Sequence, residues 1–130
     1  MKQGLLLFGH GARDPEWARP FEAVAASIRA VRPSLPVELA FLEFMTPDLP
    51  TAAARLIAAG CNELHIVPLF LGTGGHVRRD VPALVETLRA AHSASVRWQL
   101  HAPIGEHAAV VQALAAASLA TLPSASGASE

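Results

Sequence analysis

The sequence predicts an α/β fold in which a four-stranded parallel sheet lies between two layers of helices, a three-layer α/β/α arrangement. Short apolar runs alternate with longer segments whose apolar residues recur at helical spacing, in the order βαβαβαβα. The apolar runs have few polar interruptions, as expected for a sheet that helices cover on both faces. The length of 130 residues suits a single domain with one hydrophobic core.

The first half of the chain contains two of the expected strand–helix units. A glycine-bounded apolar run at 4–9 and a second run at 37–42 are typical of buried strands. The segment Asp14–Glu16 predicts a helix start, because it places a capping acid, a proline and a second acid in succession. Similar chemistry at Thr46–Asp48 opens a second helix, which we expect to run to Gly60.

The second half repeats the alternation. An almost wholly apolar run at 64–71 predicts the third strand, and the more polar run at 95–100 predicts a fourth strand at a sheet edge. Between them, Asp80 or a residue shortly before it opens a third helix. A last helix is expected to begin at Gly105.

These segments predict one domain at 1–122, followed by small polar residues at 123–130 that are typical of a disordered tail. Alternating strands and helices favour right-handed crossovers between parallel strands. We expect the strand order 2-1-3-4, as in flavodoxin-like sheets. This order places the carboxyl ends of the first three strands side by side, where ligands bind in such sheets.

Composition excludes several classes of partner. Hydrophobic residues make up 52% of the chain and charged residues 16%, which is typical of a folded domain. The net charge of -1 argues against nucleic acid as a partner. No apolar run approaches the roughly 20 residues that a membrane span needs, so we expect no membrane partner. The one cysteine, Cys61, cannot form an internal disulfide, and we expect a reducing, cytoplasmic location.

Each of the first three strands is followed by a candidate ligand at its carboxyl end: His10, Glu43 and His76. Two imidazoles and one carboxylate suit iron, cobalt, nickel or zinc better than magnesium or calcium. Glycines beside both histidines allow a large ligand to approach closely. The sequence therefore predicts a transition-metal site at this edge of the sheet.

Three arginines, Arg13, Arg78 and Arg79, lie in the same loops and suit the paired hydrogen bonds of substrate carboxylates. Ordinary structural roles stay open for all of these residues. The arginines can be solvated surface residues, His10 can cap the first helix, and Glu43 can be a salt-bridge partner.

The other histidines are weaker candidates. His65 lies within an apolar strand and is interpreted as a core histidine with its hydrogen bonds satisfied, and His92 ends a helix. His101 ends the fourth strand and can approach the site, whereas His107 falls in a first helical turn. The chain has no phosphate-loop motif and no dinucleotide-binding glycine motif, so nucleotide cofactors are not expected.

Several motifs occur together in a specific order. They are Phe-Gly-His-Gly-Ala-Arg-Asp-Pro at 8–15, Ala-Phe-Leu-Glu at 40–43 with Pro47, Val-Pro-Leu-Phe-Leu at 67–71, Gly-Gly-His-Val-Arg-Arg-Asp-Val-Pro at 74–82 and Ala-Pro-Ile-Gly at 102–105. On these motifs the chain resembles the small sirohydrochlorin chelatases, the CbiX cobaltochelatase and SirB ferrochelatase group, over about residues 3–115. One departure is Ala12, where the family often has serine.

The resemblance implies an enzyme that inserts a divalent metal into sirohydrochlorin or a close relative without ATP, in cobalamin or sirohaem biosynthesis. Co²⁺ is the first candidate and Fe²⁺ or Ni²⁺ are alternatives; no cofactor is expected beyond this substrate metal. His10 and His76 resemble the metal ligands and proton acceptors, and Glu43 resembles a third ligand or a proton relay. The arginines would then face the carboxylates of the tetrapyrrole.

The resemblance also implies how the substrate is held. Phe44, Met45, Leu71 and Val77 are expected to form an apolar wall against the macrocycle, although core packing is the commoner use of such residues. Chelatases of this superfamily usually have two lobes around the site, and this chain resembles one lobe, which predicts a homodimer. Two alternatives stay open: a tetrapyrrole or metal carrier without turnover, and a regulatory flavodoxin-like domain.

Overall fold

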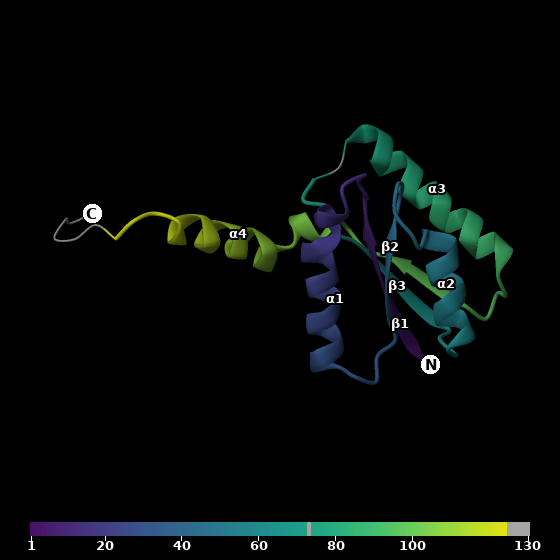
Figure 1. The fold of residues 1–130 in the computed structure, drawn as a ribbon. Helices are drawn as coiled ribbons and strands as arrows, with labels where there is room; N and C mark the ends of the chain where they lie inside the picture. Colours follow the sequence, from purple (N-terminus) through teal and green to yellow (C-terminus); the bar gives the residue numbers. More distant parts are fainter. Residues whose placement is uncertain (73, 125–130) are drawn as a thin grey trace.

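The computed structural model describes residues 1–72 and 74–124 and shows the expected three-layer fold (Figure 1). Its four strands form one parallel sheet in the order β2-β1-β3-β4, which confirms the predicted topology. The strands are β1 (Gln3–Gly9), β2 (Val37–Phe41), β3 (Glu63–Pro68) and β4 (Arg97–Leu100). The helices are α1 (Arg19–Val31), α2 (Leu49–Ala58), α3 (Gly75–Ala91) and α4 (Ala108–Ala120), with short 3-10 turns η1 (Pro15–Ala18) and η2 (Ile104–Glu106).

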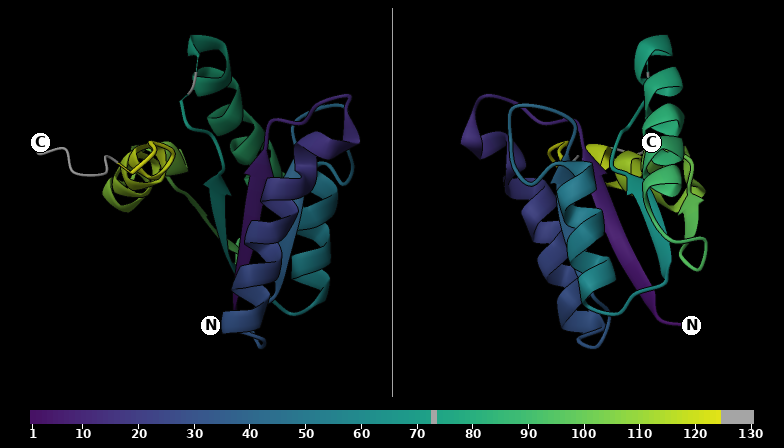
Figure 2. Two further views of the ribbon diagram at one scale, coloured as in Figure 1. Left: turned by 60° about the vertical axis from the view of Figure 1, so that its left-hand side comes forward. Right: turned by 90° about the vertical axis from the view of Figure 1, so that its right-hand side faces the viewer.

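The two faces of the sheet are covered unequally. Alternate residues of a strand point to opposite faces, so Leu6 and Phe8 of β1 join the main core with α2 and α3, where both are fully buried. On the other face, Leu7 and Val37 pack with Ala25 of α1 in a smaller cluster. Figure 2 shows α1 beside one half of this second face of the sheet. In the same views α4 lies apart from the sheet.

Capping acids position the helices as the sequence predicts. The Asp14 side chain accepts a hydrogen bond from the Glu16 amide at 3.0 Å and opens η1, which leads into α1. The Asp48 side chain accepts a hydrogen bond from the Thr51 amide at 2.9 Å and opens α2. Gly60 follows that helix with a φ of +94°, a conformation that favours glycine.

The third helix begins earlier than the sequence analysis predicted, so the predicted start at or shortly before Asp80 is wrong. α3 starts at Gly75, so the segment from His76 to Asp80 is helical and not a loop, and β3 ends at Pro68. The Arg78 amide donates to the Gly74 carbonyl at 3.0 Å and closes the first turn. No side chain caps this start, so the sequence lacked the usual signal for it.

The last helix also differs from the expectation. Gly105 lies in η2, and α4 begins only at Ala108 after His107, whose ring Nδ1 accepts a hydrogen bond from the Ala109 amide at 3.1 Å. Within 1–72 and 74–124, no helix combines the length and apolar character that crossing a membrane requires. Of the tail expected at 123–130, residues 125–130 lie outside the described residues, and the domain boundary at 122 stays a prediction.

Candidate functional site

The side chains of His10 and Glu43 meet at the carboxyl edge of the sheet. The parallel pairing of β1 with β2 continues past the strand ends, because the Leu42 amide donates to the Gly9 carbonyl at 2.9 Å. The Glu43 amide then donates to the His10 carbonyl at 3.1 Å. His10 Nε2 lies 3.4 Å from Glu43 Oε1, and both side chains are about half exposed. Strand pairing therefore sets this imidazole–carboxylate pair.

Two unusual backbone conformations support the pair. Gly11 has a φ of +93°, and a Cβ atom there would overlap the Glu43 carbonyl oxygen, so only glycine fits without a shift. Phe44 has a φ of +66°, which is uncommon for a residue with a side chain. Strained backbone of this kind is typical of functional loops. The Arg13 guanidinium lies 4.7 Å from the centroid of the Phe44 ring, a cation–π contact between the same two loops.

His76 does not join His10 and Glu43 in this structure. It lies in the first turn of α3, where its Nε2 is 3.0 Å from Asp80 Oδ2 and its side chain is 84% exposed. Among the residues that the structure describes, no three His, Cys, Asp or Glu side chains are placed to hold one metal ion. The structure thus brings together two of the three candidate ligands.

The remaining candidates lie around this edge of the sheet. Phe44 and Leu71 are 57% and 67% exposed, which is unusual for large apolar side chains. Met45 and Val77 are partly buried, and Arg78 and Arg79 are exposed on the first turns of α3. Of these side chains, Leu71 and Val77 line a cavity together with His10, whereas Arg78 lines a different cavity.

A cavity of about 330 Å³ opens beside His10, and sequence reasoning missed part of its lining. His10, Leu71 and Val77 were candidates, whereas Trp17 and Phe70 were not. The Phe70 ring lies edge-on to the His10 ring, with 6.3 Å between the centroids. The sequence carried little signal for this role, because the predicted strand at 64–71 included Phe70, whereas β3 ends at Pro68 and leaves Phe70 just beyond the carboxyl edge.

His65 and His101 form a separate pair on the face of the sheet that carries α1. His65 Nδ1 lies 2.9 Å from His101 Nε2, and His65 Nε2 lies 2.7 Å from Glu63 Oε2. The hydrogen bond with His65, and a second one from Gln3, hold the pKa of Glu63 below its usual value. Both ring nitrogens of His65 therefore have partners, as expected, and one of them is His101. The interpretation of His65 as a core residue is wrong, because its side chain is 28% exposed and belongs to neither core cluster.

The remaining histidine and cysteine candidates have structural roles. His92 ends α3, as expected, and its ring lies 5.6 Å from that of Trp98. Burial raises the pKa of the Cys61 thiol, an effect that the charge of Lys2 opposes more weakly. These residues lie outside the candidate site.

The fold and site together define a small α/β protein with an imidazole and a carboxylate at the carboxyl edge of a 2-1-3-4 sheet. Residues 4–120 match the sequence model of the CbiX family. The chain therefore belongs to the CbiX family, as the motifs predicted.

Similar proteins from archaea carry the name sirohydrochlorin cobaltochelatase. A protein of Saccharolobus islandicus is 40% identical over 82 residues, which is 63% of this chain and 62% of that protein. A protein of Methanococcus aeolicus is 35% identical over 83 residues, or 64% of this chain and 58% of that protein. The matches thus span less than two thirds of these relatives.

Solved structures share the fold over nearly the whole chain. A CbiX protein from Marinobacter aquaeolei VT8 is 32% identical with a TM-score of 0.78, covering 91% of this chain and 95% of that one. The sirohydrochlorin chelatase SirB from Bacillus subtilis subspecies spizizenii, in complex with cobalt, is 27% identical with a TM-score of 0.79. That match covers 93% of this chain and 51% of SirB. SirB from Bacillus subtilis with Fe³⁺ is 30% identical with a TM-score of 0.77, covering 95% of this chain and 49% of that one.

Proposed function

We propose that this chain is a chelatase subunit that inserts a divalent metal ion into a sirohydrochlorin-type tetrapyrrole, with Co²⁺ as the first candidate and Fe²⁺ or Ni²⁺ as alternatives. The observation that carries the proposal is the His10–Glu43 pair at 3.4 Å in a member of the CbiX family. The relatives named as sirohydrochlorin cobaltochelatases and the cobalt complex of SirB support it.

The reaction exchanges one metal ion for two protons. Each of two pyrrole nitrogens loses its proton, the metal binds the tetrapyrrole nitrogens, and two protons leave the site. Neutral imidazole binds such metals and also accepts protons near neutral pH. In our proposal His10 Nε2 contacts the metal or takes a pyrrole proton, and the Glu43 carboxylate, 3.4 Å away, is a further ligand or relays the proton to solvent.

We propose that His76 joins the other two ligands when substrate is bound. Its exposed side chain is outside the core, so a change of rotamer costs little packing energy. Its present partner, Asp80, lies one helical turn further along α3 and orients the ring through Nε2. Gly72 and Gly74 precede the helix, Gly75 is its first residue, and these glycines give this segment conformational freedom.

The macrocycle needs both apolar and cationic contacts. We propose that the exposed Phe44 and Leu71 side chains, with Met45 and Val77, contact its faces. Arg13, Arg78 and Arg79 would bind its carboxylates. Arginine suits this role because its planar guanidinium forms paired hydrogen bonds with carboxylate. Apolar contact on the ring also supplies binding energy that can bend the macrocycle and expose nitrogen lone pairs.

The active unit is proposed to be a homodimer in which two copies form the cleft. This chain aligns over 93% of its length with only 51% of cobalt-bound SirB, so two copies have about the length of that protein. Light scattering should give the mass of a dimer. A monomer that inserts metal at the full rate contradicts the shared cleft.

An absorbance assay tests the proposed reaction. Purified protein is mixed with sirohydrochlorin and Co²⁺, Fe²⁺ or Ni²⁺ separately, and the spectral change is compared with the uncatalysed rate. We expect His10→Ala to reduce kcat/KM by at least about a hundredfold, the scale for losing a proton-transfer group. His92→Gln, at the far end of α3, is the matched control and should retain the wild-type rate.

The same assay separates the enzyme from a carrier. Repeated turnover that depends on His10 and Glu43 supports the chelatase. A spectral change that stops at one tetrapyrrole per site indicates a carrier, and no change with any of the three metals contradicts both functions. Comparing kcat/KM among the metals identifies the preferred ion.

A further inference from the structure

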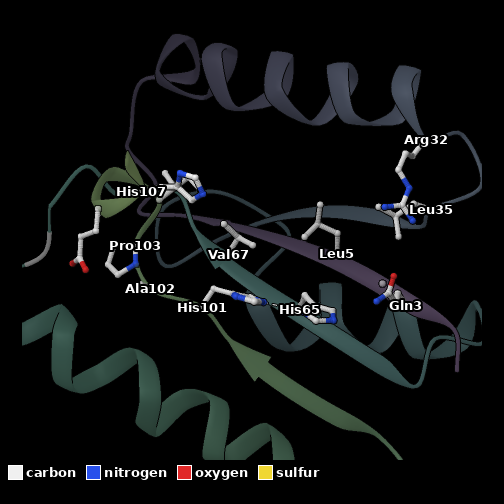
Figure 3. A pocket seen from close by; sticks show the side chains of 13 residues that line it. Gln3, Leu5, Arg32, Leu35, His65, Val67, His101, Ala102, Pro103 and His107 are labelled. Carbon is white, nitrogen blue, oxygen red and sulfur yellow. Dashed lines mark hydrogen bonds between the residues drawn. The ribbon is translucent and has the colours of Figure 1, made fainter. Parts of the chain in front are cut away.

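The histidine pair His65–His101 lies in an open groove, apart from the candidate site. A groove of about 590 Å³ runs along the face of the sheet beside α1, and both histidines line it. Figure 3 shows the two imidazole rings beside each other in this groove. His65 precedes Pro68, the last residue of β3, by three positions, which is roughly 10 Å of strand at 3.3 Å per residue. The pair is therefore separate from the His10–Glu43 pair, which lies beyond the strand ends.

The register of two strands brings the rings together. β3 and β4 are parallel neighbours, and His65 pairs with Gln99, so His101 is its diagonal neighbour on the same face of the sheet. The His101 amide donates to the Ile66 carbonyl at 2.9 Å, which extends the pairing past the end of β4. The rings stack with 5.1 Å between their centroids and 22° between their planes. The backbone therefore fixes the spacing of the two side chains.

Hydrogen bonding determines which nitrogen of His65 carries its proton. His65 Nε2 lies 2.7 Å from Glu63 Oε2, and the Gln3 side-chain amide donates to the same oxygen at 2.8 Å. Both contacts hold the pKa of Glu63 below its usual value, so at neutral pH this group is a carboxylate that can only accept. His65 Nε2 must therefore donate, which leaves the lone pair of the neutral ring on Nδ1. That nitrogen lies 2.9 Å from His101 Nε2.

The same arrangement supports histidine ligands in metal sites. A metal-bound imidazole almost always donates its other N–H to a carboxylate, carbonyl or water, which fixes the ring and its tautomer. Glu63 has this relation to His65, and Gln3 in turn orients the carboxylate. Two imidazole nitrogens that bind one ion at a right angle, each at about 2.1 Å, lie about 3.0 Å apart, whereas a tetrahedral ion would separate them by about 3.4 Å. The observed 2.9 Å fits the right angle.

We propose that His65 and His101 form a second metal site, which binds one Ni²⁺ or Cu²⁺ ion through His65 Nδ1 and His101 Nε2. Imidazole suits these ions, and both accept ligands at right angles. Neither ring belongs to a core cluster, so both can turn toward a shared ion at little cost in packing. His101 then carries its one proton on Nδ1, so neither ring changes its charge. Water fills the other positions of the ion, for which the open groove has room.

The neighbouring side chains leave these two rings as the ligands. His107 lines the same groove, but its Nδ1 accepts a hydrogen bond from the Ala109 amide at 3.1 Å. The proton of its neutral ring is therefore on Nε2, and neither nitrogen offers a lone pair to a metal. Over 1–72 and 74–124 no third His, Cys, Asp or Glu side chain is placed to complete the set. The site has two protein ligands and does not depend on the metal-insertion reaction.

Nickel binding tests the site. A variant with His10→Ala and His76→Ala lacks the two imidazoles of the candidate active site, so titration calorimetry of this variant with Ni²⁺ alone reports the second site. We expect one Ni²⁺ per chain. Adding His65→Asn or His101→Asn should lower the affinity at least about tenfold, since the loss of a ligand should cost no less than the loss of its supporting partner. His92→Asn, at the end of α3, is the matched control and should bind like the parent variant.

Replacing Glu63 tests the support of the ligand without removing either imidazole. Glutamine keeps an oxygen that can accept from His65 Nε2 but lacks the negative charge. We expect Glu63→Gln to lower the Ni²⁺ affinity about ten- to a hundredfold, the scale for the partner of a metal-bound histidine. Glu86→Gln, exposed on α3 across the sheet, is the control and should leave the affinity unchanged.

Paramagnetic broadening locates the ion. In ¹⁵N-labelled protein of the same parent variant, Cu²⁺ should broaden the amide signals of Ile66 and Gln99 at concentrations that leave Thr87 on α3 unchanged. Broadening centred elsewhere overturns the proposal, as does a Ni²⁺ affinity that survives both His65→Asn and His101→Asn. If either asparagine variant fails to fold by circular dichroism, the other variant and the broadening decide. None of these readouts uses metal insertion, so a failure here is distinct from a failure of the proposed function.

Discussion

The Glu43 amide donates a hydrogen bond to the His10 carbonyl at 3.1 Å, and the side chains of the same two residues meet at 3.4 Å. Two loops that are 33 positions apart in the sequence are thus joined through both backbone and side chain. The geometry of the candidate site therefore depends on how closely these loops pack, and it can be tested without altering either ligand.

Replacing Gly11 with alanine should disturb the His10–Glu43 pair by shifting the backbone of the two loops that carry it. The φ of +93° and the overlap of a Cβ with the Glu43 carbonyl both disfavour any side chain. We expect Gly11→Ala to lower the free energy of unfolding by about 1–3 kcal/mol, the scale of such strain, and to reduce metal insertion. Urea denaturation measures the first effect. Gly72→Ala is the control for stability, because a Cβ at Gly72 meets nothing within 4 Å, so equal losses of unfolding free energy in the two variants contradict this account.

The cap of α2 should make stability depend on pH. Hydrogen bonds from the Thr51 side chain and amide hold the pKa of Asp48 below 3.8 in the folded protein. This stabilisation is therefore complete above the unfolded pKa and is lost as the pH falls through the lower folded pKa. At neutral pH, Asp48→Ala should cost about 1 kcal/mol.

An Asp48→Asn variant distinguishes the effect of the capping hydrogen bond from the effect of the carboxylate charge. Asp48→Asn keeps a side-chain acceptor for the Thr51 amide, so it should retain most of the stability at neutral pH. The difference in unfolding free energy between wild type and Asp48→Asn should shrink as the pH falls below 3.8. A difference that stays constant through this range means that the carboxylate charge has no role.

Cys61 should be unreactive until the protein unfolds. The residue is 2% exposed, and burial raises its thiol pKa, so little thiolate is available and reagents cannot reach it. An aromatic disulfide reagent at mildly alkaline pH should titrate no thiol in native protein and one thiol per chain in denaturant. Ser27→Cys, on the exposed side of α1, provides the accessible control. Rapid labelling of native Cys61 would show that this part of the core opens readily.

Replacement of Phe8 should affect mainly stability, whereas replacement of Phe44 should affect mainly binding of the tetrapyrrole. Phe8 is fully buried, and Phe8→Ala should lower the free energy of unfolding by about 3–5 kcal/mol. Phe44 is 57% exposed. Phe44→Ala should therefore lower the free energy of unfolding by no more than about 1 kcal/mol, which is the scale of the cation–π contact with Arg13. Phe44→Ala should instead weaken sirohydrochlorin binding, measured by spectral titration. A Phe44→Ala variant that unfolds as readily as Phe8→Ala and binds normally contradicts the proposed wall.

Local sequence patterns determined the helices and strands and their order. Alternation of apolar runs with helical periodicity predicted a parallel sheet, because parallel strands need crossover connections and burial on both faces. The order 2-1-3-4 was expected by analogy with flavodoxin-like sheets, and the structure confirms it. The capping acids Asp14 and Asp48 were correctly interpreted, since a cap acts on amides only two or three residues away. The adjacency of His10 and Glu43 followed from the same rules, because both come directly after neighbouring parallel strands.

Other features depend on contacts between distant segments. The start of α3 at Gly75 lacks a capping side chain, so the helical setting of His76 and its contact with Asp80 were not predicted. The Phe70 ring beside His10 depends on how two loops pack. These placements depend on long-range packing, on which hydrophobic periodicity carries no information.

By itself, the sequence determined the sheet, the strand ends at which the candidate ligands lie and the presence of an apolar helix around Val110, Val111 and Leu114. Only the tertiary structure decided that this helix leaves the body and that the sheet face beside α1 stays open. The physical reason is that periodicity records which side chains need burial, whereas the backbone at His107 sets the direction in which α4 projects from its own sheet.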